Sequence, residues 1–373
     1  MQSPAQVANT DLLGLIADPY REWSLRFPGR RAFGYLCTYA PVELLHAAGF
    51  APVRLVQSSG AVVLAEAHLP SFSCALARTV TEQMLRGRLD FLEGVLFTHT
   101  CDTLQCLADI WRMAAPHFQV LTLSMPTVLG GAADRAYLLT ELHRLADALE
   151  TTFGCRVTRE GLLASIALYN SQRRRLSALY ERSSHLSALQ VWSLAEAGML
   201  MPVEEHVALL QGFLQNLPEP VGQVGPGPAV LVVGAILDDP LIPQLIDELG
   251  ARLAGDDLCT GSRYWDTLVD EEREPFDALT ERYMRRAPCP AKHVAGQSRA
   301  QRLLDLVRAK GAQGVVFVQL KFCDPHAFDY VPLCQALDRA GVPHLLLETD
   351  ATVSAGQIRT RLQAFLEMLG PGR

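Results

Sequence analysis

Two segments of this sequence end an apolar stretch in the same way, with cysteine followed by aspartate. Residues 94–102 (GVLFTHTCD) and 314–324 (GVVFVQLKFCD) both begin with glycine, valine, an apolar residue and phenylalanine, and they lead to Cys101 and Cys323. Short apolar runs entered through glycine are typical of buried parallel strands. Because open α/β sheets carry out their chemistry just beyond the carboxyl ends of their strands, we expect both cysteines to lie at functional sheet edges.

The sequence around the first of these segments alternates short apolar stretches with amphipathic ones. Such alternation favours a parallel sheet with crossover helices, and we assign residues 1–131 to an N-terminal α/β domain. A helical stretch is expected first, over residues 9–28. The expected strands cover residues 31–36, 51–56, 94–98 and 118–123, and the expected helices cover residues 41–49, 72–86 and 104–114.

Residues 132–215 show helical periodicity only, and we expect them to form a connector packed beside the sheets. Thr158 is expected to cap a helix of this connector, and the basic run at residues 172–175 (QRRR) is interpreted as a solvated helix face. Residues 216–228 (NLPEPVGQVGPGP) are rich in proline and glycine and indicate a linker.

A second α/β domain is expected over residues 229–373. Two half-molecules of similar design, facing each other across a cleft, are the simplest interpretation of the repeated Cys-Asp ending. The expected strands cover residues 229–236, 252–257, 314–320 and 343–348, and the expected helices cover residues 240–249, 274–286, 297–309, 325–340 and 355–369.

The composition of the chain limits its location and its partners. With a net charge of −7, 20% charged and 49% hydrophobic residues, the 373-residue chain carries no nucleic-acid-binding signature. Its N-terminus has neither the basic nor the apolar region of an export signal, and its longest apolar run, at residues 229–237, is too short to span a bilayer. We therefore expect a cytoplasmic protein without a nucleic-acid or membrane partner.

The chain contains nine cysteines, which in a reducing compartment favour metal binding or catalysis over disulfides. An iron–sulfur cluster requires thiolates, and compact ferredoxin spacings are absent, so the fold would have to assemble the ligands from distant strand ends and turns. Six cysteines are expected where the backbone leaves an element toward one sheet edge: Cys37, Cys74 and Cys101 in the first half, and Cys259, Cys289 and Cys323 in the second.

The remaining three cysteines, Cys106, Cys155 and Cys334, fall within helices or away from that edge and are interpreted as small core residues. Zinc is disfavoured because the chain has no paired CxxC or CxxxH knuckles. A single cysteine nucleophile would need a nearby histidine, and His99 and His326 are close in sequence to Cys101 and Cys323. The repetition of the Cys-Asp turn nevertheless favours ligation over one nucleophile.

Two other features bear on the chemistry of the site. Asp102 and Asp324, which follow the repeated cysteines, are expected to cap the next helices. The chain has neither a GxxxxGK[ST] loop nor a GxGxxG loop, so any ATP that takes part in its chemistry is expected to bind to another protein.

Three segments resemble a known family: residues 33–49 (FGYLCTYAPVELLHAAG), 100–102 (TCD) and 321–325 (KFCDP). The chain is similar in these segments, and over residues 9–369 as a whole, to 2-hydroxyacyl-CoA dehydratase D-components and ATP-dependent benzoyl-CoA reductase subunits. The resemblance implies two flavodoxin-like α/β domains with an iron–sulfur cluster in the cleft between them. It also implies electrons delivered by a separate ATP-hydrolysing activator that carries its own iron–sulfur cluster.

Within this family the chain looks most like the double-cubane cluster proteins. Residues 72–74, 256–264 and 287–292 supply three thiols beyond the dehydratase-like minimum of Cys37, Cys101 and Cys323. In that subgroup two [4Fe–4S] cubanes share a bridging sulfide to give an [8Fe–9S] cluster, and three cysteines hold each cubane. The resemblance thus implies six ligands, whereas a single [4Fe–4S] cluster would leave some of the thiols to packing. His99, Lys321 and His326 are near enough in sequence to donate hydrogen bonds around such a cluster.

The function expected from this resemblance is that of an iron–sulfur reductase component that reduces a small molecule with electrons from the activator. The first alternative is a subunit of a 2-hydroxyacyl-CoA dehydratase or ATP-dependent benzoyl-CoA reductase, which would act on an acyl-CoA with a single [4Fe–4S] cluster. The second is a cluster-carrying scaffold without a substrate. We expect either a homodimer or a heterodimer with a paralogous subunit.

Overall fold

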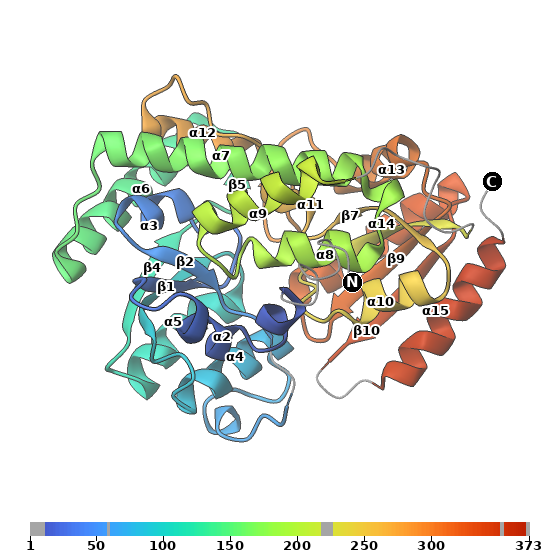
Figure 1. The fold of residues 1–373 in the computed structure, drawn as a ribbon, viewed down its shortest axis with the longest axis horizontal. Coiled ribbons are helices and arrows are strands. Elements are labelled where there is room, and N and C mark those ends of the chain that lie inside the picture. The colour runs from blue at the N-terminus through green and yellow to red at the C-terminus, as the bar shows by residue number, and fades with distance from the viewer. Residues whose placement is uncertain (1–11, 58–59, 218–226, 351–353, 371–373) are drawn as a thin grey trace.

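Two four-stranded parallel sheets form the framework of the molecule (Figure 1). The computed structural model describes residues 12–57, 60–217, 227–350 and 354–370. The strands of the first sheet, in spatial order, are β2 (Ala51–Arg54), β1 (Ala32–Tyr35), β3 (Leu92–His99) and β4 (Gln119–Ser124). Those of the second are β10 (His344–Thr349), β9 (Gly314–Leu320), β6 (Ala229–Gly234) and β7 (Arg252–Asp257). The predicted α/β class with parallel sheets is confirmed.

The two sheets have the same strand order, because the second strand of each half lies at an edge, followed by the first, the third and the fourth, and they place the repeated segments alike. Each of β3 and β9 is an inner strand, flanked by β1 and β4 in the first sheet and by β10 and β6 in the second. Both are paired in parallel with their neighbours on either side. Cys101 and Cys323 follow these two strands and therefore lie at the carboxyl ends of inner strands.

The helices of the first half cover its sheet through narrow apolar stripes. In α5 (Asp102–Ala114) the buried residues Leu104, Leu107, Ala108 and Trp111 recur at helical spacing, and the Trp111 indole donates to Thr81 Oγ1 at 3.0 Å. A helical segment at residues 12–17 precedes the other helices of this half, which are α2 (Pro19–Arg26), α3 (Val42–Ala47), η1 (Ala65–Ala67) and α4 (Ala75–Leu85).

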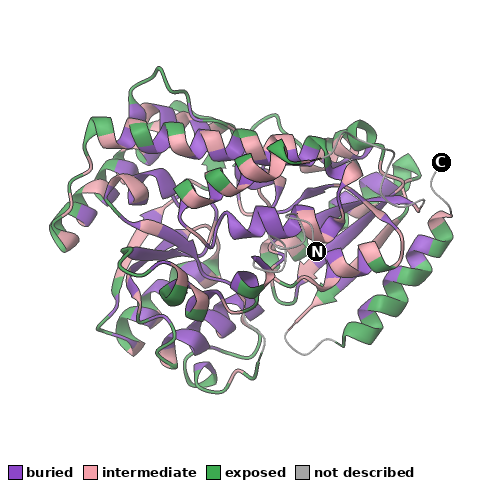
Figure 2. Ribbon diagram, viewed as in Figure 1, coloured by how far each residue is buried: buried purple, intermediate pink, exposed green. Residues whose placement is uncertain are grey.

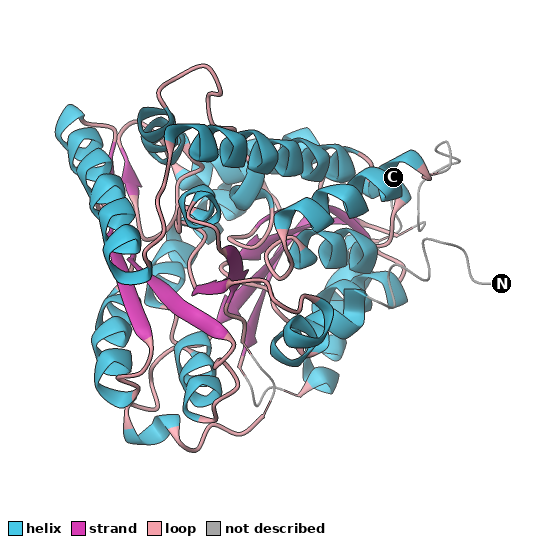
Figure 3. Ribbon diagram, turned by 60° about the vertical axis from the view of Figure 1, so that its left-hand side comes forward, coloured by secondary structure: helices cyan, strands magenta, loops and turns pink. Residues whose placement is uncertain are grey.

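The segment predicted as a helical connector forms α6 (Ala132–Phe153), α7 (Arg159–Glu181), η2 (Ser183–His185), α8 (Ala188–Ala197) and α9 (Val203–Gln215). Thr158 caps α7 as expected, because its hydroxyl accepts from the Gly161 amide at 3.0 Å. Helix α7 packs against α3 of the first half and also against α11 (Ser262–Trp265) and α12 (Pro275–Arg285) of the second (Figures 1 and 3). It therefore braces the two halves.

The interpretation of residues 172–175 as a solvated helix face is wrong for the first two of them. Arg173 is buried and donates to Glu43 Oε1 at 2.5 Å, and the buried Gln172 side chain donates to the Gly198 carbonyl at 3.1 Å. Arg174 is exposed, as expected. Since successive helix residues lie about 100° apart, a run of polar letters cannot share one face.

The second half completes its layers with α10 (Leu241–Glu248), α11, α12, α13 (Arg299–Lys310), α14 (Asp324–Ala340) and α15 (Ala355–Leu369). The strands β6 and β9 are buried almost throughout, which explains their continuous apolar sequences (Figure 2). Most of the predicted linker, residues 218–226, lies outside the described residues. The division of the chain into domains stays a prediction. No helix in the described ranges is both long and apolar enough to cross a membrane.

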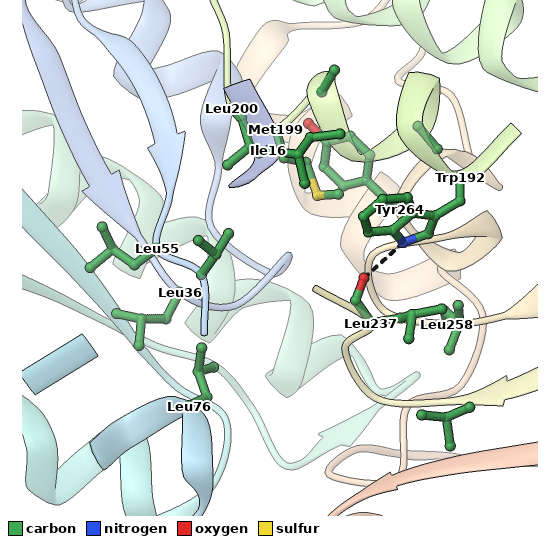
Figure 4. Packing of buried hydrophobic residues seen from close by; sticks show 14 of the residues in the cluster. Ile16, Leu36, Leu55, Leu76, Trp192, Met199, Leu200, Leu237, Leu258 and Tyr264 are labelled. Atoms are coloured by element: carbon green, nitrogen blue, oxygen red, sulfur yellow. Dashed lines mark hydrogen bonds between the residues drawn. The ribbon is translucent and has the colours of Figure 1, made fainter. Parts of the chain in front are cut away.

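One hydrophobic core extends through both halves. It contains Leu36 and Leu55 from the first half, Trp192 from α8, and Leu237 and Leu258 from the second (Figure 4). The Trp192 indole donates to the Leu237 carbonyl at 2.9 Å, so its polar atom is satisfied inside this core. Each buried leucine contributes roughly 2 kcal/mol, which makes the contact between the halves a stable one.

A short pairing that the sequence did not reveal also connects the halves. Strand β5 (Val128–Leu129), which follows β4, pairs in parallel with β8 (His293–Val294) of the second half, and the His293 amide donates to the Thr127 carbonyl at 2.8 Å. Two-residue strands have no detectable periodicity. This pairing holds the loop that contains Cys289 against the first half.

Candidate functional site

A buried charge cluster connects the carboxyl ends of the two sheets. Arg54, the last residue of β2, donates to Glu196 on α8 and to Asp238 Oδ1, at 2.8 Å, beyond the end of β6. The Gln57 amide donates to the other oxygen of Asp238 at 2.6 Å. One guanidinium therefore contacts two buried carboxyl groups. Burial raises the pKa of Glu196 to about 8. The cluster, which we call the Arg54 clamp, fixes the edges at which the predicted site lies.

Three of the six predicted ligands share one local geometry. Cys74, Cys101 and Cys323 occupy the N-cap positions of α4, α5 and α14, and we call them the helix-cap thiols. The expectation that Asp102 and Asp324 cap these helices is wrong, because each is the first helical residue and the cysteine before it is the cap. Helix N-termini stabilise negative charge, which suits a thiolate.

The helix-cap thiols lie close to one another. Burial raises the pKa of Cys101 to about 12, and the neighbouring Cys74 and Cys37 thiols act in the same direction. Burial likewise raises the pKa of Cys323 to about 12, with added effects from Cys74, Cys259 and Cys101. Backbone N–H groups of the following helical turns oppose these shifts. A bound cation would reverse the shifts, because it favours the thiolate.

The other three predicted ligands, Cys37, Cys259 and Cys289, lie in loops, and we call them the loop thiols. The Cys259 amide donates to the Ala235 carbonyl at 2.6 Å, which ties the end of β7 to the end of β6. Arg263 Nη2 lies 3.3 Å from Cys259 Sγ and donates to it. A hydrogen bond from Cys289, together with the charge of Arg263, lowers the pKa of Cys259 well below its ordinary value, and the same bond raises the pKa of Cys289.

Both groups of thiols belong to one contiguous set. Burial raises the pKa of Tyr39, and Cys289, Cys37 and Cys259 add to that shift, so all three loop thiols lie near this ring. Burial lowers the pKa of Lys292, and that shift is opposed by Cys37, Cys289 and a helix-cap thiol, Cys101. The structure thus brings all six predicted cysteines together near the carboxyl ends of the two sheets.

Sequence reasoning missed three buried cations beside the loop thiols: Arg263, Arg286 and Lys292. Arg286 Nη1 donates to the Thr38 carbonyl at 2.5 Å, and Lys292 Nζ donates to the Met125 carbonyl at 3.2 Å. Each cation lies within four positions of Cys259 or Cys289 in the sequence. That spacing was the available signal, although it could not indicate burial.

The residues predicted to donate hydrogen bonds around a cluster, His326, His99 and Lys321, differ in their placement. His326 lies against Cys259, which partly opposes the lowering of the His326 pKa by burial. His99 Nδ1 lies 3.3 Å from Ser124 Oγ, and burial lowers the pKa of this imidazole too. Lys321 is exposed, with its Nζ 5.3 Å from the centre of the Phe322 ring.

The three cysteines interpreted as core residues also differ. Cys106 is exposed on α5, so the core interpretation is wrong for it. Cys155 is half-buried and donates to the Leu149 carbonyl at 3.3 Å, and Cys334 is half-buried against the core of the second sheet. These two pack at the margins of hydrophobic cores, in partial agreement with the interpretation.

The donor set suits a polynuclear centre better than a single ion. Within the described ranges, no three His, Cys, Asp or Glu side chains converge on one point where a metal ion could be held. In an iron–sulfur cubane each thiolate binds a different iron, so the ligands surround the cluster and need not meet. Soft thiolates from separate elements, all of them partly exposed, fit such a group.

Comparison with known proteins identifies the family. The family model described as 2-hydroxyglutaryl-CoA dehydratase, D-component, matches residues 37–369. The chain belongs to this family. Its match begins at Cys37 and includes all six predicted ligands.

Three relatives illustrate the range of this family. The (R)-phenyllactyl-CoA dehydratase beta subunit of Clostridium sporogenes is 27% identical over 91% of this chain and 92% of its own length. The lactoyl-CoA dehydratase beta subunit of Anaerotignum propionicum is 29% identical over 91% of this chain and 92% of its own. A benzoyl-CoA reductase subunit of Thauera aromatica is 27% identical over 87% of each chain. The 2-hydroxyacyl-CoA dehydratase and benzoyl-CoA reductase resemblance is therefore confirmed at the level of the family.

Proposed function

We propose that this chain is an iron–sulfur reductase component that receives low-potential electrons from an ATP-hydrolysing iron–sulfur activator and reduces a small molecule. Its family carries a [4Fe–4S] cluster. The observation that carries the proposal is the contiguous set of six thiols near the carboxyl ends of the two sheets. The proposed ligands of an [8Fe–9S] double cubane are Cys37, Cys74, Cys101, Cys259, Cys289 and Cys323.

The protein's own groups would make this site suitable for low-potential electron transfer. When bound, the cluster would accept single electrons and pass them on. The helix N-termini at the helix-cap thiols and the buried cations at the loop thiols stabilise negative charge there. Cys37, Cys74 and Cys101 pack against the hydrophobic core that contains Leu36 and Leu76 (Figure 4), which lowers the polarity on that side of the site. The Arg54 clamp ties the carboxyl ends of the two sheets together.

The second candidate is a subunit of a 2-hydroxyacyl-CoA dehydratase or ATP-dependent benzoyl-CoA reductase. In this case Cys37, Cys101 and Cys323 would hold one [4Fe–4S] cluster and the substrate would be an acyl-CoA. The names of the relatives favour this candidate, because they include dehydratase beta subunits and a benzoyl-CoA reductase subunit. Because those names include beta subunits, they also support a heterodimer with a paralogous partner subunit. The alternative is a homodimer.

Iron and sulfide analysis of the anaerobically purified chain tests the proposal. About eight irons per chain support the double cubane, about four support the single cluster, and none in protein prepared without oxygen would contradict both. The untreated chain and the chain after reconstitution with iron and sulfide should be compared, so that loss during purification is recognised.

Turnover then distinguishes the enzyme from a scaffold. The iron-loaded chain, a purified activator and ATP are incubated with small multiply bonded molecules in one series and with acyl-CoA thioesters in another. Product that depends on ATP supports a reductase or dehydratase. Cluster transfer to an acceptor protein without product in either series supports the scaffold. The cytoplasmic location stays a prediction that fractionation of the source cells would test.

A further inference from the structure

The two groups of thiols are stabilised by different kinds of positive charge. Each helix-cap thiol lies at the N-terminus of a helix at least eleven residues long, where backbone N–H groups favour the thiolate. The loop thiols lie beside full cationic side chains: Arg263, Arg286 and Lys292 are 3%, 2% and 6% exposed. A side-chain cation carries about twice the charge of a helix N-terminus.

Arg263 is held at Cys259 by the backbone of the second half. It lies on α11, four residues after Cys259, and its Nη2 donates both to the Gly234 carbonyl and to Cys259 Sγ. Its Nε and Nη1 atoms are buried and make no hydrogen bond in the described part of the chain. The guanidinium is thus fixed at the thiol while two of its donor groups stay unsatisfied.

Arg286 connects the backbone of Arg263 to the loop that carries a second loop thiol, Cys37. Its Nη2 donates to the Arg263 carbonyl at 2.7 Å and its Nη1 to the carbonyl of Thr38, the neighbour of Cys37. Its Cζ lies 4.6 Å from the centre of the Tyr39 ring, which stabilises the cation further. Arg286 therefore fixes the backbone of Arg263 relative to the Cys37 loop.

The nearby acidic residues leave Arg263 short of a counter-charge. Asp257 is shared by three guanidinium groups, with nitrogen to oxygen distances of 3.7 Å to Arg263, 3.1 Å to Arg299 and 3.6 Å to Arg302. One carboxylate cannot neutralise three cations. The positive charge that Asp257 does not neutralise lies on whichever arginine has no other carboxylate beside it.

Two of the three arginines have a second carboxylate. Arg299 lies 2.6 Å from Asp329, and Arg302 lies 3.9 Å from Asp266. Arg263 has no second carboxylate within 4 Å among the described residues, and the group of opposite sign beside it is the Cys259 sulfur once it is deprotonated. Arg286 and Lys292 form no ion pair in the same ranges, so the loop-thiol side is the electropositive side of the site.

We propose that Arg263 is a positioning residue that holds Cys259 as a ligand and raises the reduction potential of the iron bound there, so that an added electron resides on the loop-thiol side. This rests on the proposed function, because it requires a cluster at the six thiols. The physical reason is that a fixed cation stabilises the reduced state, which is more negative by one charge than the oxidised state. The activator would supply that electron.

The test is an EPR-monitored redox titration of the full chain, purified without oxygen, with iron content measured on each sample. The variants are Arg263→Gln and Arg263→Lys. The matched control is Arg282→Gln, which removes an equally buried guanidinium that donates to the Thr267 and Tyr264 carbonyls. It tests whether any lost buried cation has the same effect.

The expected result is that Arg263→Gln keeps its iron but becomes harder to reduce. Because a charge-assisted hydrogen bond from a fixed cation favours the reduced state, the reduced-to-oxidised ratio at a fixed potential should fall about tenfold without it. Tenfold corresponds to a midpoint about 59 mV lower for a one-electron couple. Arg263→Lys, which keeps the charge, should recover most of the shift, and Arg282→Gln should show less than about half of it.

Three outcomes would overturn this inference: a wild-type midpoint in iron-loaded Arg263→Gln, an equal shift in Arg282→Gln, or loss of iron in both Arg263 variants, which would indicate a structural role only. If Arg263→Gln alone loses its iron, a near-wild-type midpoint in Arg263→Lys supports the inference. A wild-type chain without iron would instead contradict the proposed function itself, so the two failures are distinguishable.

Discussion

The helix-cap thiols and the loop thiols reach the same site by different routes. Cys101 and Cys323 follow β3 and β9, which are corresponding inner strands of the two sheets, whereas Cys37 follows the inner strand β1 and Cys259 follows the edge strand β7. Each of the two groups contains cysteines from both halves of the chain. The internal repeat therefore explains only one pair of cysteines. The other four cysteines and the buried cations of the candidate site lie outside the repeated segments.

This comparison is tested most strongly by removing one thiol from each group. Cys101→Ser should lose most of its iron and more than about 100-fold of its activity, because even outer partners of a metal site are worth 10- to 100-fold. Cys259→Ser should lose its iron as well if the cluster is a double cubane, but should keep about four irons if it is single. Iron analysis and EPR provide the measurement, and Cys106→Ser, at an exposed position, is the matched control.

Full iron retention in Cys101→Ser would remove the helix-cap thiols from the site altogether. Equal losses in Cys106→Ser would indicate a general effect of cysteine replacement on folding. Either outcome would end the comparison between the two groups.

The next largest effect is expected where the loop of Cys37 is supported by the connector. The helix that follows this loop, α3, carries Glu43, which is buried against Arg173. Arg173→Met should lower the free energy of unfolding by about 3–5 kcal/mol, because it leaves a buried carboxylate without its partner. Arg174→Met removes a neighbouring but exposed arginine and should cost less than about 1 kcal/mol.

Denaturant unfolding of the iron-free protein measures both values. Similar losses in the two variants would show that burial of the Arg173 pair is not what stabilises this region.

The sequence was sufficient for the features that depend on local pattern. Strands β3 and β9 are apolar, begin near glycine and lead to cysteine, so their burial and their repeated role could be predicted from the letters alone. The α/β alternation also predicted both parallel sheets. Thr158 shows that caps follow ordinary preferences when the side chain can reach the next turn.

The rest of the site depends on contacts between distant segments. Cys289 is placed by the pairing of β5 with β8, which is too short to leave a periodic signal. The burial of Arg173, Arg263 and Lys292 results from packing of the two halves, whereas isolated basic letters usually indicate surface. The aspartates after the repeated cysteines were misassigned as caps because α5 begins two residues, and α14 one residue, earlier than the pattern indicated.

A smaller effect is expected from a buried histidine in the helical connector, which makes the stability of the fold depend on pH. His206 on α9 is fully buried, and its Nδ1 accepts from Gln172 while its Nε2 donates to the Leu194 carbonyl at 2.8 Å. Burial lowers its pKa to about 4, below the ordinary value of about 6.5. The unfolded chain therefore binds the extra proton first, and the stabilisation present above pH 6.5 is lost as the pH falls toward 4. It amounts to about 3 kcal/mol.

Unfolding free energies of the iron-free chain at about pH 7.5 and about pH 4.5, on either side of the ordinary histidine pKa, test this expectation. His206→Gln should be less stable at neutral pH but should lose less on acidification than the wild type. An equal loss in both proteins would assign the acid sensitivity to other groups.

The smallest expected effect concerns the backbone beside a helix-cap thiol. Phe322, directly before Cys323, has φ 64° and is the only non-glycine residue in the described ranges with a positive φ. Phe322→Gly should be neutral or stabilising by up to about 1 kcal/mol, since glycine adopts this conformation without the cost of a Cβ. Phe328→Gly, at an exposed position within α14, should instead destabilise by about 1 kcal/mol, because glycine is a poor helix former. Denaturant unfolding of the iron-free variants measures both changes. If the two substitutions destabilise the protein equally, the positive φ of Phe322 carries no strain beside Cys323.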